Sequence, residues 1–424
     1  MEQYYHSVVL EKELCCGCTN CLKRCPTEAI RIRNGKAHIL SQRCIDCGEC
    51  IRVCPHHAKR AHSAPLQEIN QYKVKVAIPA PALFGQFNNL DDLDIVLTGL
   101  LSIGFDYIYE VSRAAELVSE ATRELIRQHK LNKPIISSAC PAVVRLIKIR
   151  FPELCDNVMP LLAPMEVAAK MARREIIEKT GIDDKDIGVF FITPCPAKVT
   201  EIHSPNHADK SAVNGAIAIS QIYPQLTAAM DKLQVVEPLS HSGLIGVGWA
   251  TSGGEAVAML GDKYLAADGI ENVIRVLEEL EDEHIRDVEF VELNACSGGC
   301  VGGVLTVENP YVAQARIHTL RKFMPVSLNH LDLADLDIMM WDNKLTYDAS
   351  SFALSGDIFE AMEMMDNLEK IADSLPGLDC GSCGAPTCRA LAEDIVRGNA
   401  RETDCIHKLK KKIQNVYDEL TSGL

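Results

Sequence analysis

The chain contains no stretch of about 18 uncharged apolar residues, which argues against a membrane span. Its first residues, MEQYYHSVVLEKEL, lack a basic segment followed by an apolar run, so no secretory signal peptide is expected. Positive charge is also scarce: 43 Lys and Arg stand against 58 Asp and Glu, and the net charge is -15. This balance argues against nucleic acid or an anionic membrane surface as the main partner. We therefore expect a cytoplasmic protein.

Cysteine, by contrast, is abundant, with 18 in 424 residues. In a chain of this size without an export signal, so many thiols indicate metal ligands rather than a disulfide scaffold. Hydrophobic residues make up 47% of the chain, which is typical of a globular protein with room for about two to four domains.

Two cysteine runs near the N-terminus share the spacing C-x2-C-x2-C-x3-C followed by proline. This spacing is the pattern of two-cluster bacterial ferredoxins, in which the fourth cysteine of each run binds the other cluster. Two complete runs make a zinc site improbable, although paired cysteines also bind zinc. The predicted ligands of one [4Fe–4S] cluster are Cys15, Cys18, Cys21 and Cys54, and those of the other are Cys44, Cys47, Cys50 and Cys25.

A third group of cysteines lies near the C-terminus, at Cys380, Cys383, Cys388 and Cys405. Glycines at 381 and 384 let this loop approach a metal cluster closely. Four thiolates suit zinc as well as a [4Fe–4S] cluster, so both remain open. The segment DCGSCGAPTCRALAEDIVRG resembles a small [4Fe–4S] domain of electron-transfer proteins, and we favour the cluster.

The middle of the chain alternates between strand and helix patterns, which predicts an α/β fold. Strands are expected over residues 73–80, 106–111, 134–138, 186–193 and 287–294, and helices over 91–105 and 113–130. In the tail, helices are expected over 359–375, 389–400 and 406–424. The predicted domains are a ferredoxin-like domain at 1–71, a central two-lobed domain at 72–352 and a helical four-cysteine domain at 353–424.

Six cysteines remain, and two of them, Cys16 and Cys155, are interpreted as thiols without a metal role. The other four lie in the three loops SSACP, TPCPAK and LNACSGGC, and each loop follows a predicted strand. Because loops at the ends of neighbouring strands meet at one sheet edge, these four thiols are expected to converge. They are Cys140, Cys195, Cys296 and Cys300.

With these three loops behind a double ferredoxin pattern, residues 1–350 resemble the [FeFe]-hydrogenases. The resemblance implies an H-cluster, in which a [4Fe–4S] cluster is bridged by Cys300 to a two-iron unit with CO, cyanide and an azadithiolate. Its implied activity is the heterolytic splitting or formation of H2, with electrons passing through the three further [4Fe–4S] clusters. Lys198 matches the lysine that hydrogen-bonds a cyanide, as a compact ammonium donor can. Pro81 and Ala82 are expected to line the pocket of the diatomic ligands.

Several residues depart from the pattern of catalytic family members. Ala139 replaces the cysteine that relays protons, and a methyl group has no exchangeable proton. Arg123 replaces a glutamate of the proton path, whereas Glu120 and Glu201 match family acids. Losing a general acid or base costs roughly two to four orders of magnitude in rate.

Two further departures touch the surroundings of the two-iron unit. Thr193 and Asn294 stand where catalytic members place methionines. Changes so close to a metal centre alter its redox potential and ligand affinity.

Together with the tail cysteines, these departures resemble the sensory [FeFe]-hydrogenases, which implies slow turnover and detection of H2. The alternatives are a metabolic ferredoxin-linked hydrogenase with a rerouted proton path and a non-enzymatic iron–sulfur assembly factor or electron carrier. The implied partners are H2 and protons, a ferredoxin or signalling protein, and the maturation enzymes of the two-iron unit. Apolar positions in the final helix either form a homodimer seam or pack on their own domain.

Overall fold

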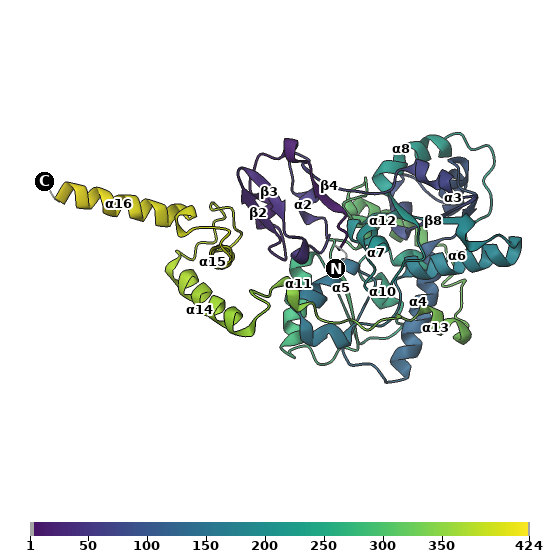
Figure 1. Ribbon diagram of the computed structural model, residues 1–424. Helices are drawn as coiled ribbons and strands as arrows, with labels where there is room; N and C mark the ends of the chain where they lie inside the picture. The colour runs from purple at the N-terminus through teal and green to yellow at the C-terminus, as the bar shows by residue number, and fades with distance from the viewer. Residues whose placement is uncertain (1–3, 423–424) are drawn as a thin grey trace. The chain divides into compact units, whose positions relative to one another are not determined.

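The computed structural model describes residues 4–422, which fold as two compact units (Figure 1). The first unit comprises Met1–Val8, Ile45–Gly48 and Ala61–Tyr347, and the second comprises Val9–Cys44, Glu49–Arg60 and Asp348–Leu424. Residues 1–3 of the predicted ferredoxin-like domain and residues 423–424 of the last predicted helix lie outside the described residues.

A four-stranded parallel sheet organises the first unit. Its strand order is β6 (Tyr107–Ile108), β5 (Val74–Pro79), β8 (Ile187–Thr193) and β9 (Gly215–Ala218). Every residue of β8 is buried, as expected for a strand covered on both faces.

Helices cover both faces of this sheet. Successive side chains of β5 point to opposite faces, so Val76 and Ile78 join one hydrophobic core and Ala77 joins another. Helices α4 (Val111–Arg127) and α6 (Pro164–Thr180) contribute to the first core, and α3 (Leu93–Ser102) and α8 (Ile219–Met230) contribute to the second.

A second parallel sheet has the order β10 (Tyr264–Asp268), β11 (Phe290–Asn294) and β7 (Ile135–Ile136). Val291 and Leu293 pack with α5 (Pro141–Arg150) and α11 (Ile270–Glu281). The predicted α/β class is confirmed, although the strands expected at 106–111 and 134–138 shrink to two residues each, because only those residues pair with a neighbour. The other helices of this unit are α7 (Pro196–His203), α9 (Leu244–Gly248), α10 (Gly254–Val257), α12 (Pro310–Arg321) and α13 (Leu336–Met339).

An Asn-Gly pair between β-prone residues predicts a hairpin, and the second unit contains one, formed by β2 (Ile30–Arg33) and β3 (Lys36–Ile39). Asn34 and Gly35 turn the chain at φ values of 52° and 70°, which suit a two-residue hairpin turn. Short helices α1 (Asn20–Lys23) and α2 (Glu49–Arg52) each carry the third cysteine of a run, Cys21 and Cys50. Strand β4 (Lys59–Ala61) pairs with β1 (Val8–Leu10).

The C-terminal part of this unit consists of α14 (Ile358–Ser374), α15 (Cys388–Val396) and α16 (Ile406–Ser422). Helix α15 ends before the expected residue 400 because Gly398 adopts a left-handed φ of 74° just after the helix. None of the described helices is long and apolar enough to cross a membrane.

Candidate metal and active site

Two of the predicted ligands sit at the starts of helices. Cys140 is the N-cap of α5 and Cys195 is the N-cap of α7, and each is followed by a proline in the first helical position. Proline suits that position because its fixed φ is helical and the helix needs no donor there. A helix N-terminus also favours a thiolate.

Three of the four predicted H-cluster ligands face one cavity of the first unit. Cys140, Cys195 and Cys300 line a cavity of about 90 Å³ at the ends of β8 and β11. Cys296 belongs to the loop of Cys300, where its carbonyl accepts a hydrogen bond from Gly299 N at 3.1 Å. The three loops bring three of the four predicted thiols to one cavity. They do so from the ends of strands in two sheets, β8 in one and β7 and β11 in the other, and not at one sheet edge as expected.

The electrostatics of these thiols fit a metal site. Burial and the charge of Cys140 raise the pKa of Cys195 to about 11. Burial and the other two thiols raise the pKa of Cys300 to about 12, although part of its surface is accessible. Several thiolates this close are stable together only beside a cation, so a bound iron–sulfur cluster would resolve their repulsion.

Other predicted residues surround the same cavity. Lys198, Pro81 and Asn294 line it, and the positive charge of Lys198 acts on Cys195 and Cys300. Thr193 is not among the described cavity residues; its hydroxyl donates to Cys195 O at 3.2 Å and accepts from Cys195 N at 3.1 Å. Thr193 thus holds the Cys195 loop in place.

Ala139 also lines the cavity, directly before Cys140. Its backbone N–H donates to Ser137 Oγ at 3.1 Å. The side chain offers no proton, so any proton leaving the cavity must pass to another group.

The predicted remnants of the family proton path lie away from the described cavity wall. Glu120 accepts hydrogen bonds from Leu331 N at 2.7 Å and His330 Nδ1 at 2.9 Å, and Arg123 donates to Ala258 O at 2.6 Å. Burial acts to raise the pKa of Glu120, but the Leu331 and His330 hydrogen bonds lower it. Glu120 is therefore stabilised as an anion rather than as a proton carrier.

Glu201 lies on α7 and is likewise fully engaged. It accepts from His207 Nδ1 at 2.9 Å and from Asn206 N at 3.0 Å. Burial acts to raise the pKa of Glu201, but the hydrogen bond and charge of His207 lower it.

The cavity wall also contains two buried acids that were not predicted from the sequence, Glu255 of α10 and Glu292 of β11. Ser137 Oγ donates to Glu255 Oε2 at 2.6 Å, while Glu292 accepts from Ala256 N at 2.8 Å. Burial and the charge of Glu292 raise the pKa of Glu255 to about 8. The repulsion between two buried carboxyls favours the protonated form of Glu255. A glutamate inside the predicted strand 287–294 was the available signal.

In the second unit, Cys15, Cys18, Cys21 and Cys54 line one small pocket. Backbone N–H groups point at the sulfurs: Ala37 N lies 3.4 Å from Cys15 Sγ, and Ala58 N lies 3.3 Å from Cys54 Sγ. Lys59, which is 2% exposed, also borders this pocket, and its ammonium has no hydrogen-bond partner among the described residues. Donors and an unpaired cation around four thiols fit an anionic [4Fe–4S] cluster.

The other predicted ferredoxin set divides between the two units. Cys25, Cys44 and Cys50 belong to the second unit and Cys47 to the first. The N–H of Ala29 donates to Cys25 Sγ at 3.2 Å, which matches the hydrogen bond from Ala58 N to Cys54 Sγ in the other run. The assignment of these four ligands stays a prediction.

The C-terminal cysteines gather in one place. Cys383, Cys388 and Cys405 border the same small hydrophobic core, and Cys383 is close enough to Cys405 and Cys380 to interact electrostatically. Asp379 accepts from Cys388 N at 2.6 Å and closes the loop. The arrangement suits four-thiolate coordination of a cluster or of zinc.

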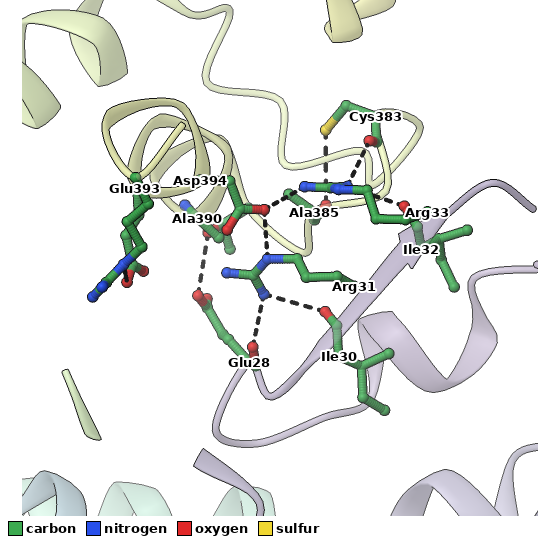
Figure 2. A network of polar contacts seen from close by, with 12 residues as sticks. Glu28, Ile30, Arg31, Ile32, Arg33, Cys383, Ala385, Ala390, Glu393 and Asp394 are labelled. Carbon is green, nitrogen blue, oxygen red and sulfur yellow. Dashed lines mark hydrogen bonds and ion pairs between the residues drawn. The ribbon is translucent and has the colours of Figure 1, made fainter. Parts of the chain in front are cut away.

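Helix α15 and the C-terminal cysteine loop contact strand β2 of the β2–β3 hairpin. Asp394 of α15 lies between Arg31 and Arg33 of β2, with oxygen–nitrogen distances of 2.7 and 2.5 Å (Figure 2). Ile32 N donates to Gly384 O at 2.8 Å, and any Cβ at Gly384 would lie 2.2 Å from Ile32 O. Only glycine allows the cysteine loop to approach the strand this closely.

Three family models match the chain, one in each of the three regions that contain a group of predicted cysteine ligands. Residues 73–262 and 240–304 match the family described as iron only hydrogenase large subunit, C-terminal domain. Residues 7–55 match a 4Fe-4S dicluster domain, and residues 375–407 match an Fe-S cluster family. The matches support iron–sulfur cofactors in all three regions.

Individual relatives are distant. The chain is 23% identical to Iron hydrogenase 1 of Clostridium pasteurianum over 267 residues, which is 52% of this chain and 46% of that protein. It is 23% identical to the cytosolic Fe-S cluster assembly factor NAR1 of Scheffersomyces stipitis over 164 residues, 36% of this chain and 30% of that protein. The matched segments thus span less than half of either relative. A solved structure of [FeFe]-hydrogenase HydA1 from Chlamydomonas reinhardtii aligns with a TM-score of 0.49 at 17% identity, covering 68% of this chain and 94% of that one.

Proposed function

Because the chain belongs to the iron-only, or [FeFe]-, hydrogenase family, we propose that it is a sensory [FeFe]-hydrogenase that splits or forms H2 slowly. The observation that supports this best is a single cavity. It combines Cys140, Cys195, Cys300 and Lys198 with Ala139, a residue that cannot relay a proton.

In this proposal Cys140, Cys195, Cys296 and Cys300 would hold the H-cluster, with Cys300 as the ligand shared with the two-iron unit. When bound, the two-iron unit supplies the site at which H2 is split or formed. Lys198 donates a hydrogen bond to a cyanide from its place in the cavity wall, and Pro81 and Asn294 shape the surroundings.

Protons are held and moved by this chain's own groups. Glu255 lines the cavity and can take up or release a proton there, while the hydroxyl of Ser137, which accepts from Ala139 N–H, donates to Glu255 Oε2. Burial and the charge of Glu292 raise the pKa of Glu255 to about 8, which lets Glu255 hold the proton near neutral pH. A hydroxyl between two partners is a weaker acid than a cysteine thiol, and turnover is correspondingly slow.

Electrons pass through [4Fe–4S] clusters held by the ferredoxin cysteines and by Cys380, Cys383, Cys388 and Cys405. The C-terminal loop also approaches α1, where a Cβ at Gly381 would lie only 3.1 Å from Leu22 Cδ2, next to Cys21, and this closeness supports transfer between the two regions. The recipient is a ferredoxin or a signalling protein.

A homodimer through α16 completes the proposal. Five apolar residues of this helix are exposed and follow the alternating three- and four-residue spacing of a coiled-coil seam: Ile406, Leu409, Ile413, Val416 and Leu420. Ile413→Asp should halve the molar mass measured by light scattering, whereas Lys411→Asp, on the same helix, should not. An unchanged mass in both variants would exclude this seam.

A metabolic hydrogenase is the second candidate, because Glu255 and Ser137 provide a rerouted proton path. The matched segment of the assembly factor supports a third, a protein that binds only cubanes. To separate the first two, the matured protein is compared with Iron hydrogenase 1 in H2 uptake. Slow turnover together with reduction of the accessory clusters by H2 supports sensing, and an equal rate supports the metabolic role.

A further inference from the structure

The strongest unexplained feature outside the cavity is the buried side chain of Lys59. It is 2% exposed, and Nζ has no hydrogen-bond partner among the described residues. Burying an unpaired ammonium is costly, so a fold retains it only where negative charge compensates. No carboxylate is paired with Lys59 in the described part of the chain.

The compensating charge is expected in the pocket that Lys59 borders. Cys15, Cys18, Cys21 and Cys54 line that pocket, and the positive charge of Lys59 acts on the thiol of Cys21. A [4Fe–4S] core with four thiolate ligands is a net anion, and it gains one more negative charge on reduction. An adjacent ammonium therefore favours the reduced form.

The two cysteine runs allow an internal comparison. Lys59 is the fifth residue after Cys54, and Ile30 is the fifth residue after Cys25. The positions are structurally equivalent, since the preceding residues, Ala58 and Ala29, donate their N–H groups to Cys54 Sγ at 3.3 Å and to Cys25 Sγ at 3.2 Å. Both side chains are 2% exposed. The fold accepts an apolar residue at this position, so packing alone does not require the lysine.

We propose that Lys59 is a redox-tuning residue, whose ammonium raises the reduction potential of the cluster held by Cys15, Cys18, Cys21 and Cys54. The inference rests on the proposed function in that these thiols must hold a [4Fe–4S] cluster. The step it biases moves one electron and no proton: a neighbouring reduced cubane is oxidised as this cluster is reduced. The electron then rests beside Leu22, where the C-terminal cysteine loop makes its contact.

The test uses full-length protein reconstituted with iron and sulfide but without the two-iron unit. Paramagnetic resonance follows a titration with dithionite. In Lys59→Met the ratio of reduced to oxidised cluster should fall about tenfold for one cubane at a fixed potential. This corresponds to a midpoint potential lower by about 59 mV for a one-electron couple. Lys59→Arg keeps the charge and should stay near wild type. Arg60→Met removes the same charge from the exposed neighbouring position and should shift nothing.

Iron content separates the outcomes. Full iron with unshifted midpoints in Lys59→Met overturns the role of Lys59 and leaves the proposed function intact. Wild-type protein lacking the iron of this cluster would instead contradict the ligand assignment itself. Lys59→Met could instead lose the iron of this cluster. In that case, iron retained in Lys59→Arg supports a requirement for the positive charge. Iron lost from both variants assigns Lys59 to packing and overturns the inference.

Discussion

Glu255→Gln tests how protons leave the cavity. Glutamine keeps the size of the side chain and can still accept the 2.6 Å hydrogen bond from Ser137, but it cannot hold a transferable proton. Ala139 provides no parallel relay in the same wall. Removing a general acid or base typically costs about 10²–10⁴ in rate, which corresponds to about 2.7–5.4 kcal/mol of activation free energy. We expect H2 evolution by the matured protein to fall within that range.

The matched control is Glu120→Gln. Glu120 faces His330 and Leu331 rather than the described cavity wall, so its loss should leave the rate within about twofold of wild type. Rates are normalised to the infrared intensity of the bound two-iron unit. A wild-type rate in Glu255→Gln, or a large loss in Glu120→Gln, would refute the proposed proton route.

The remaining predictions concern the relay position and the C-terminal contact. Ala139→Cys should raise H2 evolution and should rescue most of the loss in Glu255→Gln; an unchanged or lower rate in fully loaded protein would count against the relay argument. Asp394→Asn leaves Arg31 buried without its counter-ion, and breaking a buried pair costs about 3–5 kcal/mol. Proteolysis within residues 375–407 should therefore accelerate by about two to four orders of magnitude. The control variant Arg389→Gln, which breaks an exposed salt bridge with Glu369, should be cleaved at the wild-type rate.

Much of the architecture was predictable because its signals are local. The buried strand 187–193 is a nearly continuous apolar run, which a sequence shows directly. The Cys-Pro pairs at Cys140 and Cys195 likewise mark the starts of two helices, because the proline takes the first helical position. The hairpin followed from Asn34 and Gly35 in the same way.

The features that escaped prediction depend on contacts between distant residues. Ser137 and Glu255 are separated by 118 positions, and nothing in TSGGEAV indicates that its acid lies in the cavity wall. The contact between Arg31 and Asp394 joins residues 363 positions apart. Lys59 follows a cysteine run at a position where the first run has Ile30, and its burial without a partner emerges only from the packing.

The most direct test of the central claim is infrared spectroscopy of the protein after maturation, recorded under N2, H2 and CO. The account predicts bands of iron-bound CO and cyanide that respond to H2, and Cys300→Ser should abolish them while the ferredoxin cubanes remain. Protein that retains its cubanes but develops no such bands would contradict a hydrogenase active site in this cavity.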